Sequence, residues 1–368
     1  MHTVLVLGGY GFFGERISKA LAGNANVRLL VAGRDISRAK DSARALQLPD
    51  DHAIRLDATS RDFSTSIRSL GVNTLVHTAG PFQTQDYKVA SDAIEANANY
   101  VDLADGRNFV SGIGALDSTA RRNGVVVVSG ASSVPALSSA VVDKYLPAFS
   151  RLDSIRVGIG SGARAPGLAT VQGVFGYCGK PIRRLENGTW VDTYGWLDLT
   201  RYKFPEPVGH RFLGSCDVPD LELFPKRYDP VRTVTFHGGF ASDAGHLFVW
   251  VMSALVKAGV FSTIAPLARS LNRLSRWIEP IVSDKGAMFV ELEGIDREEQ
   301  AAKKRWHIVA AQNHGPYIPC AAAIAVTEKI VSGATLRKGA QPCMGMLTVE
   351  ECLAPLKSLN IQVMEDPV

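Results

Sequence analysis

The sequence lacks the cysteine patterns that mark disulfide-rich or zinc-binding proteins. Its 368 residues include five cysteines, and none of them belongs to a CxxC pair. Scattered single cysteines are typical of reduced thiols, and they exclude a disulfide framework and a cysteine zinc site. We therefore expect a cytoplasmic protein without a bound metal, and no basic, apolar leader pattern at the first residues opposes this.

Long hydrophobic runs and one-sided charge are also missing. The most apolar later stretch, 247–256 (LFVWVMSALV), is too short to span a bilayer. We interpret it as a buried or interface helix, with a membrane-surface contact as the alternative. Lysine and arginine total 40 against 36 acidic residues, so the net charge is only +4. Without a basic block, we expect no nucleic-acid partner.

Several catalytic signatures are absent as well. The chain has no HExxH, no GxSxG and no Walker loop ending in Gly-Lys-Ser/Thr. These absences exclude the common zinc protease, serine hydrolase and P-loop NTPase classes. Chemistry that a bound organic cofactor performs needs none of these motifs.

A glycine-rich turn near the start of the chain points to such a cofactor. The apolar run Val4 to Leu7 is followed by Gly9-Tyr10-Gly11-Phe12-Phe13-Gly14, and a helical pattern then continues to Gly23. Strand, GxGxxG turn and helix in this order form a dinucleotide-binding fingerprint, in which the helix N-terminus binds phosphates. The predicted cofactor-binding residues of this turn are Gly8, Gly9, Tyr10, Gly11, Phe12, Phe13 and Gly14.

The end of the second predicted strand, 27–32, favours NADP over NAD. An acidic residue at this point would bind a ribose 2′-hydroxyl, whereas this chain has Gly33 and Arg34, with Arg38 one helical turn later. A cation there can pair with a 2′-phosphate. Asp35 complicates this reading, and its alternative role is to cap the following helix.

Further strands alternate with helices along the first part of the chain. Apolar runs at 53–56, 72–77, 100–103 and 125–128 are separated by helical patterns. This repetition predicts an α/β fold with a Rossmann doubly wound parallel sheet. Strand ends in such sheets face the ligand. We therefore add Asp57 as an adenine contact or a turn-capping acid, and the loop Ala79, Gly80, Pro81 and Phe82 beside the cofactor.

These motifs together resemble a known family. GYGFFG, Ala32-Gly33-Arg34, Ala79-Gly80-Pro81-Phe82, Tyr100-Val101-Asp102 and the turn from Gly130 to Pro135 occur in the same order in the saccharopine dehydrogenase-like oxidoreductases. The resemblance implies a Rossmann domain at 1–150, an inserted α+β domain at 151–318 for substrate binding and dimerisation, and C-terminal helices at 319–368 that return to the Rossmann domain. The pair Phe12-Phe13 departs from the smaller residues of many relatives.

The second domain shows a different pattern. Strands are expected at 155–159, 173–177 and 233–236, with a clear hairpin from 287–295 to 304–311. The stretch 190–224 has little periodicity and is interpreted as a long loop that covers a site. Within it, Arg201, Lys203 and His210 are candidates to bind a substrate carboxylate, with an ordinary exposed loop as the alternative.

Candidate proton donors follow two strands of the first domain. Asp102 and Asp105 come at the end of the strand near residue 100, and His77 ends the strand before it. Neighbouring carboxylates can have their pKa values pushed apart, which leaves one neutral acid. The alternatives are turn or capping acids for the aspartates and a core histidine for His77.

The family resemblance implies a function. We expect an NADP-dependent oxidoreductase that transfers hydride to or from an imine or amine carbon of a small metabolite, acting as a homodimer. A carbonyl or enoyl reductase acting on an apolar substrate and a non-catalytic NADP-binding sensor or scaffold are the alternatives.

Overall fold

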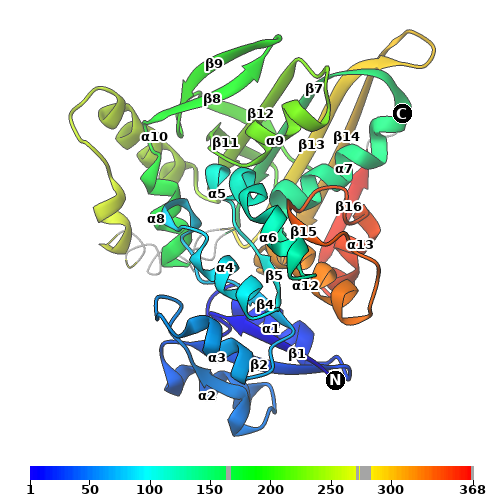
Figure 1. Cartoon of the computed structure of the whole chain (residues 1–368). Coiled ribbons are helices and arrows are strands. Elements are labelled where there is room, and N and C mark those ends of the chain that lie inside the picture. The colour runs from blue at the N-terminus through cyan, green and yellow to red at the C-terminus, as the bar shows by residue number, and fades with distance from the viewer. Residues whose placement is uncertain (163–166, 271–272, 274–282, 366–368) are drawn as a thin grey trace. The chain divides into compact units, whose positions relative to one another are not determined.

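The computed structural model describes residues 1–162, 167–270, 273 and 283–365. The chain divides into two compact units (Figure 1). The first unit contains Met1–Leu137 and Tyr317–Leu356, and the second contains Ser138–Pro316 and Lys357–Val368. Residues of the two units therefore interleave along the sequence, although each unit has its own sheet. The assignment of a cofactor or substrate role to each stretch stays a prediction.

The first unit is a doubly wound parallel α/β unit, which confirms the predicted fold class. Its seven strands lie in the order β15-β6-β5-β4-β1-β2-β3, so the order reverses between β1 and β4. The strands are β1 (His2–Leu7), β2 (Val27–Gly33), β3 (Ala53–Arg55), β4 (Thr74–His77), β5 (Asn99–Asp102), β6 (Val126–Ser129) and β15 (Gly339–Pro342). The helices are α1 (Gly14–Ala22), α2 (Ile36–Ala45), α3 (Phe63–Ser69), α4 (Lys88–Glu95), α5 (Arg107–Gly112), α6 (Asp117–Arg122), α12 (Ile318–Val331) and α13 (Val349–Leu353).

Continuous apolar strands explain why this sheet is covered on both faces. Val4, Leu5 and Val6 are all fully buried, as expected for a parallel strand between two helical layers. Leu5, Leu75 and Tyr100 belong to a core cluster that also includes residues of α3 and α4. α12 contacts β4 and β5, which gives a C-terminal helix a place in this unit.

The second unit contains a nine-stranded mixed sheet, in which β12 and β7 are parallel. Its strands are β7 (Phe149–Gly160), β8 (Pro181–Glu186), β9 (Thr189–Tyr194), β10 (Thr200–Lys203), β11 (His210–Ser215), β12 (Thr233–Gly239), β13 (Gly286–Asp296), β14 (Ala301–Ala310) and β16 (Ile361–Glu365). Its helices include α7 (Ser138–Tyr145), α8 (Leu168–Gly176), α9 (Asp220–Arg227) and α10 (Asp243–Lys257). The predicted hairpin is confirmed as β13 and β14, which pair from Gly286 with Ala310 to Ile295 with Ala301.

Two predictions about the second unit are wrong. The strand expected at 173–177 lies almost wholly in helix α8, because a short apolar run does not distinguish a helix from a strand by periodicity. The stretch 190–224, expected to lack structure, contains most of β9, all of β10 and β11, and the start of α9. These strands are short, and their partners in the sheet cannot be read from local pattern.

The C-terminal segment contributes a strand to the sheet of each unit. Residues up to Leu356 cluster with the first unit, where β15 pairs with β6. Ile361–Glu365 instead forms β16, which pairs with β14 in the second sheet. Helix α13 begins with a capping box, since the Thr348 hydroxyl accepts from the Glu351 backbone amide and the Glu351 carboxylate accepts from the Thr348 backbone amide.

Candidate functional site

The glycine turn between β1 and α1 is shaped by close backbone approach. Gly8 has φ +83°, a left-handed backbone conformation that favours glycine. A Cβ at Gly11 would lie 2.9 Å from the Gly8 carbonyl oxygen, and one at Gly14 would overlap that oxygen and lie 2.7 Å from Thr78 Oγ1. Helix α1 then begins without a side-chain cap. Its first N–H groups and dipole can therefore bind an anion, as a dinucleotide phosphate requires.

The aromatic pair of this turn packs at the start of α1, next to residues that contact the C-terminal segment. The rings of Phe12 and Phe13 meet edge to face at 5.0 Å. The Arg16 guanidinium lies 4.5 Å from the Phe12 ring centre and 5.0 Å from the Tyr317 ring centre, and the Cys320 thiol donates to the Phe13 carbonyl at 3.7 Å. The start of α1 is therefore linked to the C-terminal segment by the Phe13 carbonyl and by Arg16, on which Phe12 packs.

The end of β2 holds Tyr10 and two exposed arginines. A Cβ at Gly33 would overlap the Tyr10 hydroxyl, which accepts a hydrogen bond from the Asp35 amide at 2.9 Å. The Arg38 guanidinium lies 4.7 Å from the centre of the Tyr10 ring and donates to the Tyr10 carbonyl at 3.2 Å. Arg34 is exposed and makes no hydrogen bond to another described residue. Asp35 caps α2 by accepting from Ser37 and Arg38 amides, so the capping alternative for Asp35 is confirmed.

Sequence reasoning missed a third cation at this end of the sheet. Arg55, at the end of β3, is exposed and lies in register with Gly33. The signal was present, since Arg55 lies two residues before Asp57 at the end of β3, the strand that pairs with β2. Asp57 itself is exposed and accepts from the amide and hydroxyl of Thr59. The hydrogen bond from the Thr59 backbone amide is the main cause that lowers the pKa of Asp57. The Asp57 carboxylate therefore stabilises the turn after β3.

The loop after β4 contributes less surface than its four predicted residues suggest. Phe82 is buried, with its ring 5.0 Å from that of His77 and 5.4 Å from that of Phe109. Ala79, Gly80 and Pro81 are exposed or partly exposed. The side-chain amide of Gln85 donates to the carbonyls of Ala79 and Pro81 and so fixes this loop. Phe82 supports the loop from the core.

Asp102 organises the turn after β6. Its side chain is fully buried, and Oδ1 accepts from the Gly130 amide at 2.8 Å, the Ala104 amide at 2.9 Å and the Ser129 hydroxyl at 3.0 Å. Burial nevertheless raises the pKa of Asp102 to about 6. Oδ1 is thus held by backbone and hydroxyl donors on two neighbouring strand ends, whereas the buried Oδ2 has no hydrogen-bond partner among the described residues.

His77 and Asp105 lie in contrasting surroundings. His77 is buried, and its Nδ1 lies 3.0 Å from the Tyr100 hydroxyl. Burial lowers the pKa of His77 to about 4, so the ring is neutral near pH 7. Asp105 is exposed, and its Oδ1 accepts from the Gln83 amide at 2.9 Å. Of the three predicted proton donors, Asp105 is the one whose side chain reaches the surface.

The three predicted substrate-binding residues share a hairpin of the second unit. Arg201 and Lys203 lie on β10, and His210 begins β11 directly opposite Lys203. Because opposite residues of an antiparallel pair point to the same face, the structure brings these three exposed side chains to one face. Tyr202 points the other way and stacks on Phe289 at 4.0 Å.

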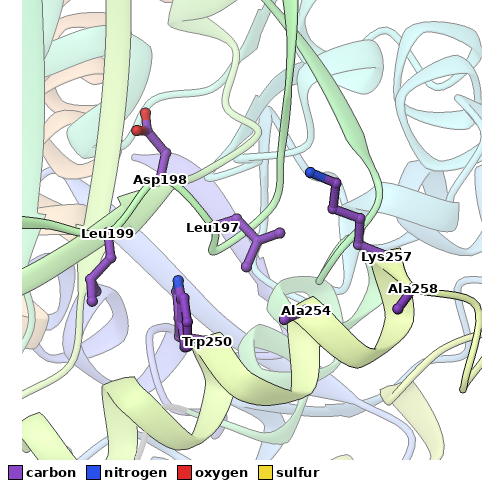
Figure 2. Close-up of a pocket in the computed structure, with 7 residues that line it drawn as sticks. All are labelled: Leu197, Asp198, Leu199, Trp250, Ala254, Lys257 and Ala258. Carbon is purple, nitrogen blue, oxygen red and sulfur yellow. The ribbon is translucent and has the colours of Figure 1, made fainter.

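A polar cluster around the exposed Asp198 and an adjacent pocket were not predicted. Asp198 Oδ2 lies 2.8 Å from Arg184 Nη1, 3.4 Å from Ser215 Oγ and 3.6 Å from His237 Nε2. Trp196 and Asp198 both have φ +62°, a conformation that the sequence does not signal. The pocket, about 510 Å³, lies beside this loop and α10 (Figure 2). It is lined by Leu197, Asp198, Leu199, Trp250, Ala254, Lys257 and Ala258.

Two further classes of site find no support in the described residues. Within the described ranges, no group of three or more histidine, cysteine or acidic side chains is placed to hold a metal ion. The helices formed by those same residues are all too short or too polar to cross a bilayer.

Comparison with known proteins agrees with the fold and with the glycine turn. Residues 4–128 match the family model of the saccharopine dehydrogenase NADP binding domain. A solved structure of apo saccharopine dehydrogenase (L-Glu forming) from Saccharomyces cerevisiae is 12% identical, with 100% of both chains covered and a TM-score of 0.69. A probable dehydrogenase from Thermotoga maritima is 8% identical, with 96% of this chain and 93% of that chain covered and a TM-score of 0.48.

No curated protein sequence matches the chain. At 12% identity the saccharopine dehydrogenase structure shows a shared fold alone, whereas the family model matches the residues that form the glycine turn and the strand ends. Residues 4–128 of the chain therefore form an NADP-binding domain that is similar to that of saccharopine dehydrogenase.

Proposed function

We propose that the chain reduces an imine, or oxidises the corresponding amine, of a small metabolite with NADP as the hydride carrier. The observation that carries this proposal is the glycine turn of a saccharopine dehydrogenase-like domain followed by basic residues at the end of β2. Bound NADP supplies or accepts the hydride, and the protein supplies position and a proton. The imine class comes from the family resemblance and is the finer part of the proposal.

The residues present fit a phosphorylated dinucleotide. The absence of a side chain at Gly8, Gly11 and Gly14 lets the backbone turn tightly before the uncapped helix α1, where pyrophosphate oxygens can accept N–H bonds. Arg34 is the cation best able to reach a 2′-phosphate, because Arg38 already contacts Tyr10. Arg38 supports the same site by holding the Tyr10 ring in place.

We assign the proton-transfer step to Asp105, at the carboxyl end of β5. Its carboxylate is exposed and held by Gln83, so it can approach a bound molecule. Asp102 and His77 are buried and act as positioning residues, Asp102 for the turn at Gly130 and His77 through the Tyr100 hydroxyl. Arg201, Lys203 and His210 are proposed to bind a substrate carboxylate.

A reductase assay tests the reaction class and Asp105 together. We expect the full chain to oxidise NADPH when a 2-oxo acid and a primary amine are present together, and to form a secondary amine. Asp105→Asn should lower kcat by about 100-fold, in the usual range for a lost general acid, while NADPH affinity is unchanged. Asp86→Asn, an exposed aspartate in the loop after β4, serves as the matched control.

Three results would contradict parts of this proposal. An unchanged kcat in Asp105→Asn would remove Asp105 from the mechanism. Turnover of carbonyl or enoyl compounds alone would favour the alternative reductase, for which the apolar pocket of the second unit is the supporting observation. NADPH binding without turnover of any compound class would favour a sensor or scaffold.

We further propose that the protein is a cytoplasmic homodimer that binds a small-molecule substrate. Sedimentation of the purified chain measures its oligomeric state directly, and a monomer would refute the dimer. Fractionation of expressing cells measures its location. Co-sedimentation with liposomes tests the alternative of a membrane-surface contact through the helix that contains Trp250.

A further inference from the structure

The pocket of the second unit is held open by a loop with unusual backbone geometry. Trp196 and Asp198, on either side of Leu197, both adopt left-handed backbone conformations. Non-glycine residues persist in this region only where their surroundings hold them there, and such residues concentrate at functional sites. The loop that forms one wall of the pocket is therefore a strained element that other contacts must support.

Those contacts surround the loop. The Trp196 amide donates to the Ser215 carbonyl at 2.7 Å, and the Ser215 amide donates to the Leu197 carbonyl at 2.9 Å. The Trp196 indole is buried and stacks on Phe240 at 4.6 Å. Asp198 is anchored by Arg184. The wall is thus rigid before a ligand arrives, which lowers the entropic cost of binding.

The opposite wall is one face of α10. Trp250, Ala254, Lys257 and Ala258 recur at helical spacing and line the pocket (Figure 2). A second face of the same helix, formed by His246, Val249, Ser253 and Val256, is buried. The small side chains of Ala254 and Ala258 leave room beside the Trp250 ring. Together with Leu197 and Leu199, these residues make a lining that is mostly apolar.

Two charged residues line the pocket, and they differ in how well they are neutralised. Asp198 Oδ2 pairs with Arg184 Nη1 at 2.8 Å and lies 3.6 Å from His237 Nε2, and Arg184 also pairs with Glu186. Lys257 is exposed, and its ammonium lies 4.0 Å from the centre of the Tyr194 ring. It forms no ion pair with another residue in the described part of the chain. The Lys257 ammonium can therefore pair with an anionic group of a ligand.

Apolar surface continues beyond the pocket along α10. Leu247, Phe248 and Val251 are 38 to 47% exposed on this helix. Neighbouring exposed apolar side chains on one element mark a binding surface more often than isolated ones do. A ligand with a long aliphatic chain would cover both the pocket lining and this strip.

We propose that this pocket binds a long-chain aliphatic carboxylate. Its chain lies between the Leu197–Leu199 loop and the Trp250–Ala254 face of α10, and its carboxylate accepts from the Lys257 ammonium. The volume of about 510 Å³ is within the range of small-molecule pockets. The pocket shares no lining residue with the cofactor, proton-transfer and substrate residues proposed above.

Binding of dodecanoate to the full-length protein without NADP tests the proposal. We expect saturable binding by calorimetry, with a change in tryptophan fluorescence that Trp250→Phe removes. Lys257→Gln should weaken dodecanoate binding about tenfold, as expected for a lost charge-assisted hydrogen bond, and leave dodecanol binding unchanged. Lys226→Gln, an exposed lysine on α9 outside the pocket, should bind dodecanoate like the original protein.

Two more variants address the apolar walls. Ala254→Phe should fill the pocket and abolish binding. Leu199→Glu places a negative charge at an exposed wall position and should weaken carboxylate binding. This second variant tests the apolar wall independently if Ala254→Phe does not fold. Equal affinity for dodecanoate and dodecylamine, or unchanged binding in Lys257→Gln, would overturn the proposal. A third result would assign the surface to a second copy of the chain. In that case dodecanoate does not bind saturably, and the protein self-associates whether or not dodecanoate or Lys257 is present.

Discussion

At the residue scale, cofactor choice depends on cations at the ends of β2 and β3. Arg34 is exposed, whereas Arg38 packs on Tyr10, and Arg55 lies across from Gly33. A guanidinium that is free of other hydrogen bonds can form a bidentate pair with a phosphate. The three arginines therefore differ in role although they have the same charge.

Replacement of Arg34 tests this difference. Arg34→Gln should weaken NADPH binding about tenfold or more and leave NADH binding nearly unchanged, because only NADPH carries the 2′-phosphate. Fluorescence titration with each nucleotide measures both affinities. Arg28→Gln, at the opposite end of the same strand, is the matched control. An equal loss for NADPH and NADH would show that Arg34 does not recognise the 2′-phosphate.

At the scale of elements, the glycine turn docks α1 on the end of the sheet. Gly14 is the first residue of the helix, and a Cβ there would overlap the Gly8 carbonyl oxygen. The same Cβ would lie 2.7 Å from Oγ1 of Thr78, in the loop after β4. At the other end of α1, Gly23 has φ −79° and only the Ala20 carbonyl oxygen within 4.0 Å of a Cβ. One helix thus has a glycine that packing requires and one that it does not.

Alanine at each position makes a matched pair. Gly14→Ala should destabilise the first unit by about 1 to 3 kcal/mol, since the added methyl group meets backbone that cannot move easily, and it should weaken NADPH binding. Gly23→Ala should be neutral or slightly stabilising because it restricts the unfolded chain. Thermal unfolding followed by circular dichroism, together with NADPH titration, measures both effects. Similar stability losses at both positions would contradict the packing argument.

At the scale of the whole molecule, buried titratable groups make stability depend on pH. Burial raises the pKa of Asp220, at the start of α9, from 3.8 to about 7, and that of Asp102 to about 6. Between pH 4 and their folded-state pKa values, the folded protein binds more protons than the unfolded chain. Stability therefore falls as pH rises through this window. Buried His77 and His246, with pKa values of about 4, act oppositely up to about pH 6.5.

Asp220→Asn isolates one of these contributions. The variant cannot ionise, so its stability relative to the original protein should improve by about 2 to 3 kcal/mol between about pH 5 and about pH 8. Urea unfolding followed by tryptophan fluorescence measures this change in the second unit, which contains the four described tryptophans, Trp190, Trp196, Trp250 and Trp306. Asp192→Asn, an exposed aspartate on β9, should show no such change. Parallel pH profiles for Asp220→Asn and the original protein would exclude Asp220 as the source.

Local sequence determined the first unit and its cofactor end. The apolar runs that became β1 to β6, the GxGxxG turn, the capping role of Asp35 and the hairpin β13–β14 all depend on residues close together in the chain. Backbone propensity, turn chemistry and side-chain periodicity act over such short distances. The same local signals explain why the resemblance to an NADP-binding family could be recognised from motifs alone.

Tertiary structure decided what those motifs could not. Periodicity did not reveal α8, the strands within 190–224, or the pairing of β16 with β14, because their partners lie far away in the sequence. Three predicted proton donors at neighbouring strand ends became one exposed carboxylate, Asp105, and two buried groups. Burial and the choice of hydrogen-bond partner depend on which distant residues surround a side chain. For the same reason, the pocket beside Trp250 exists only after the Trp196–Asp198 loop has met α10.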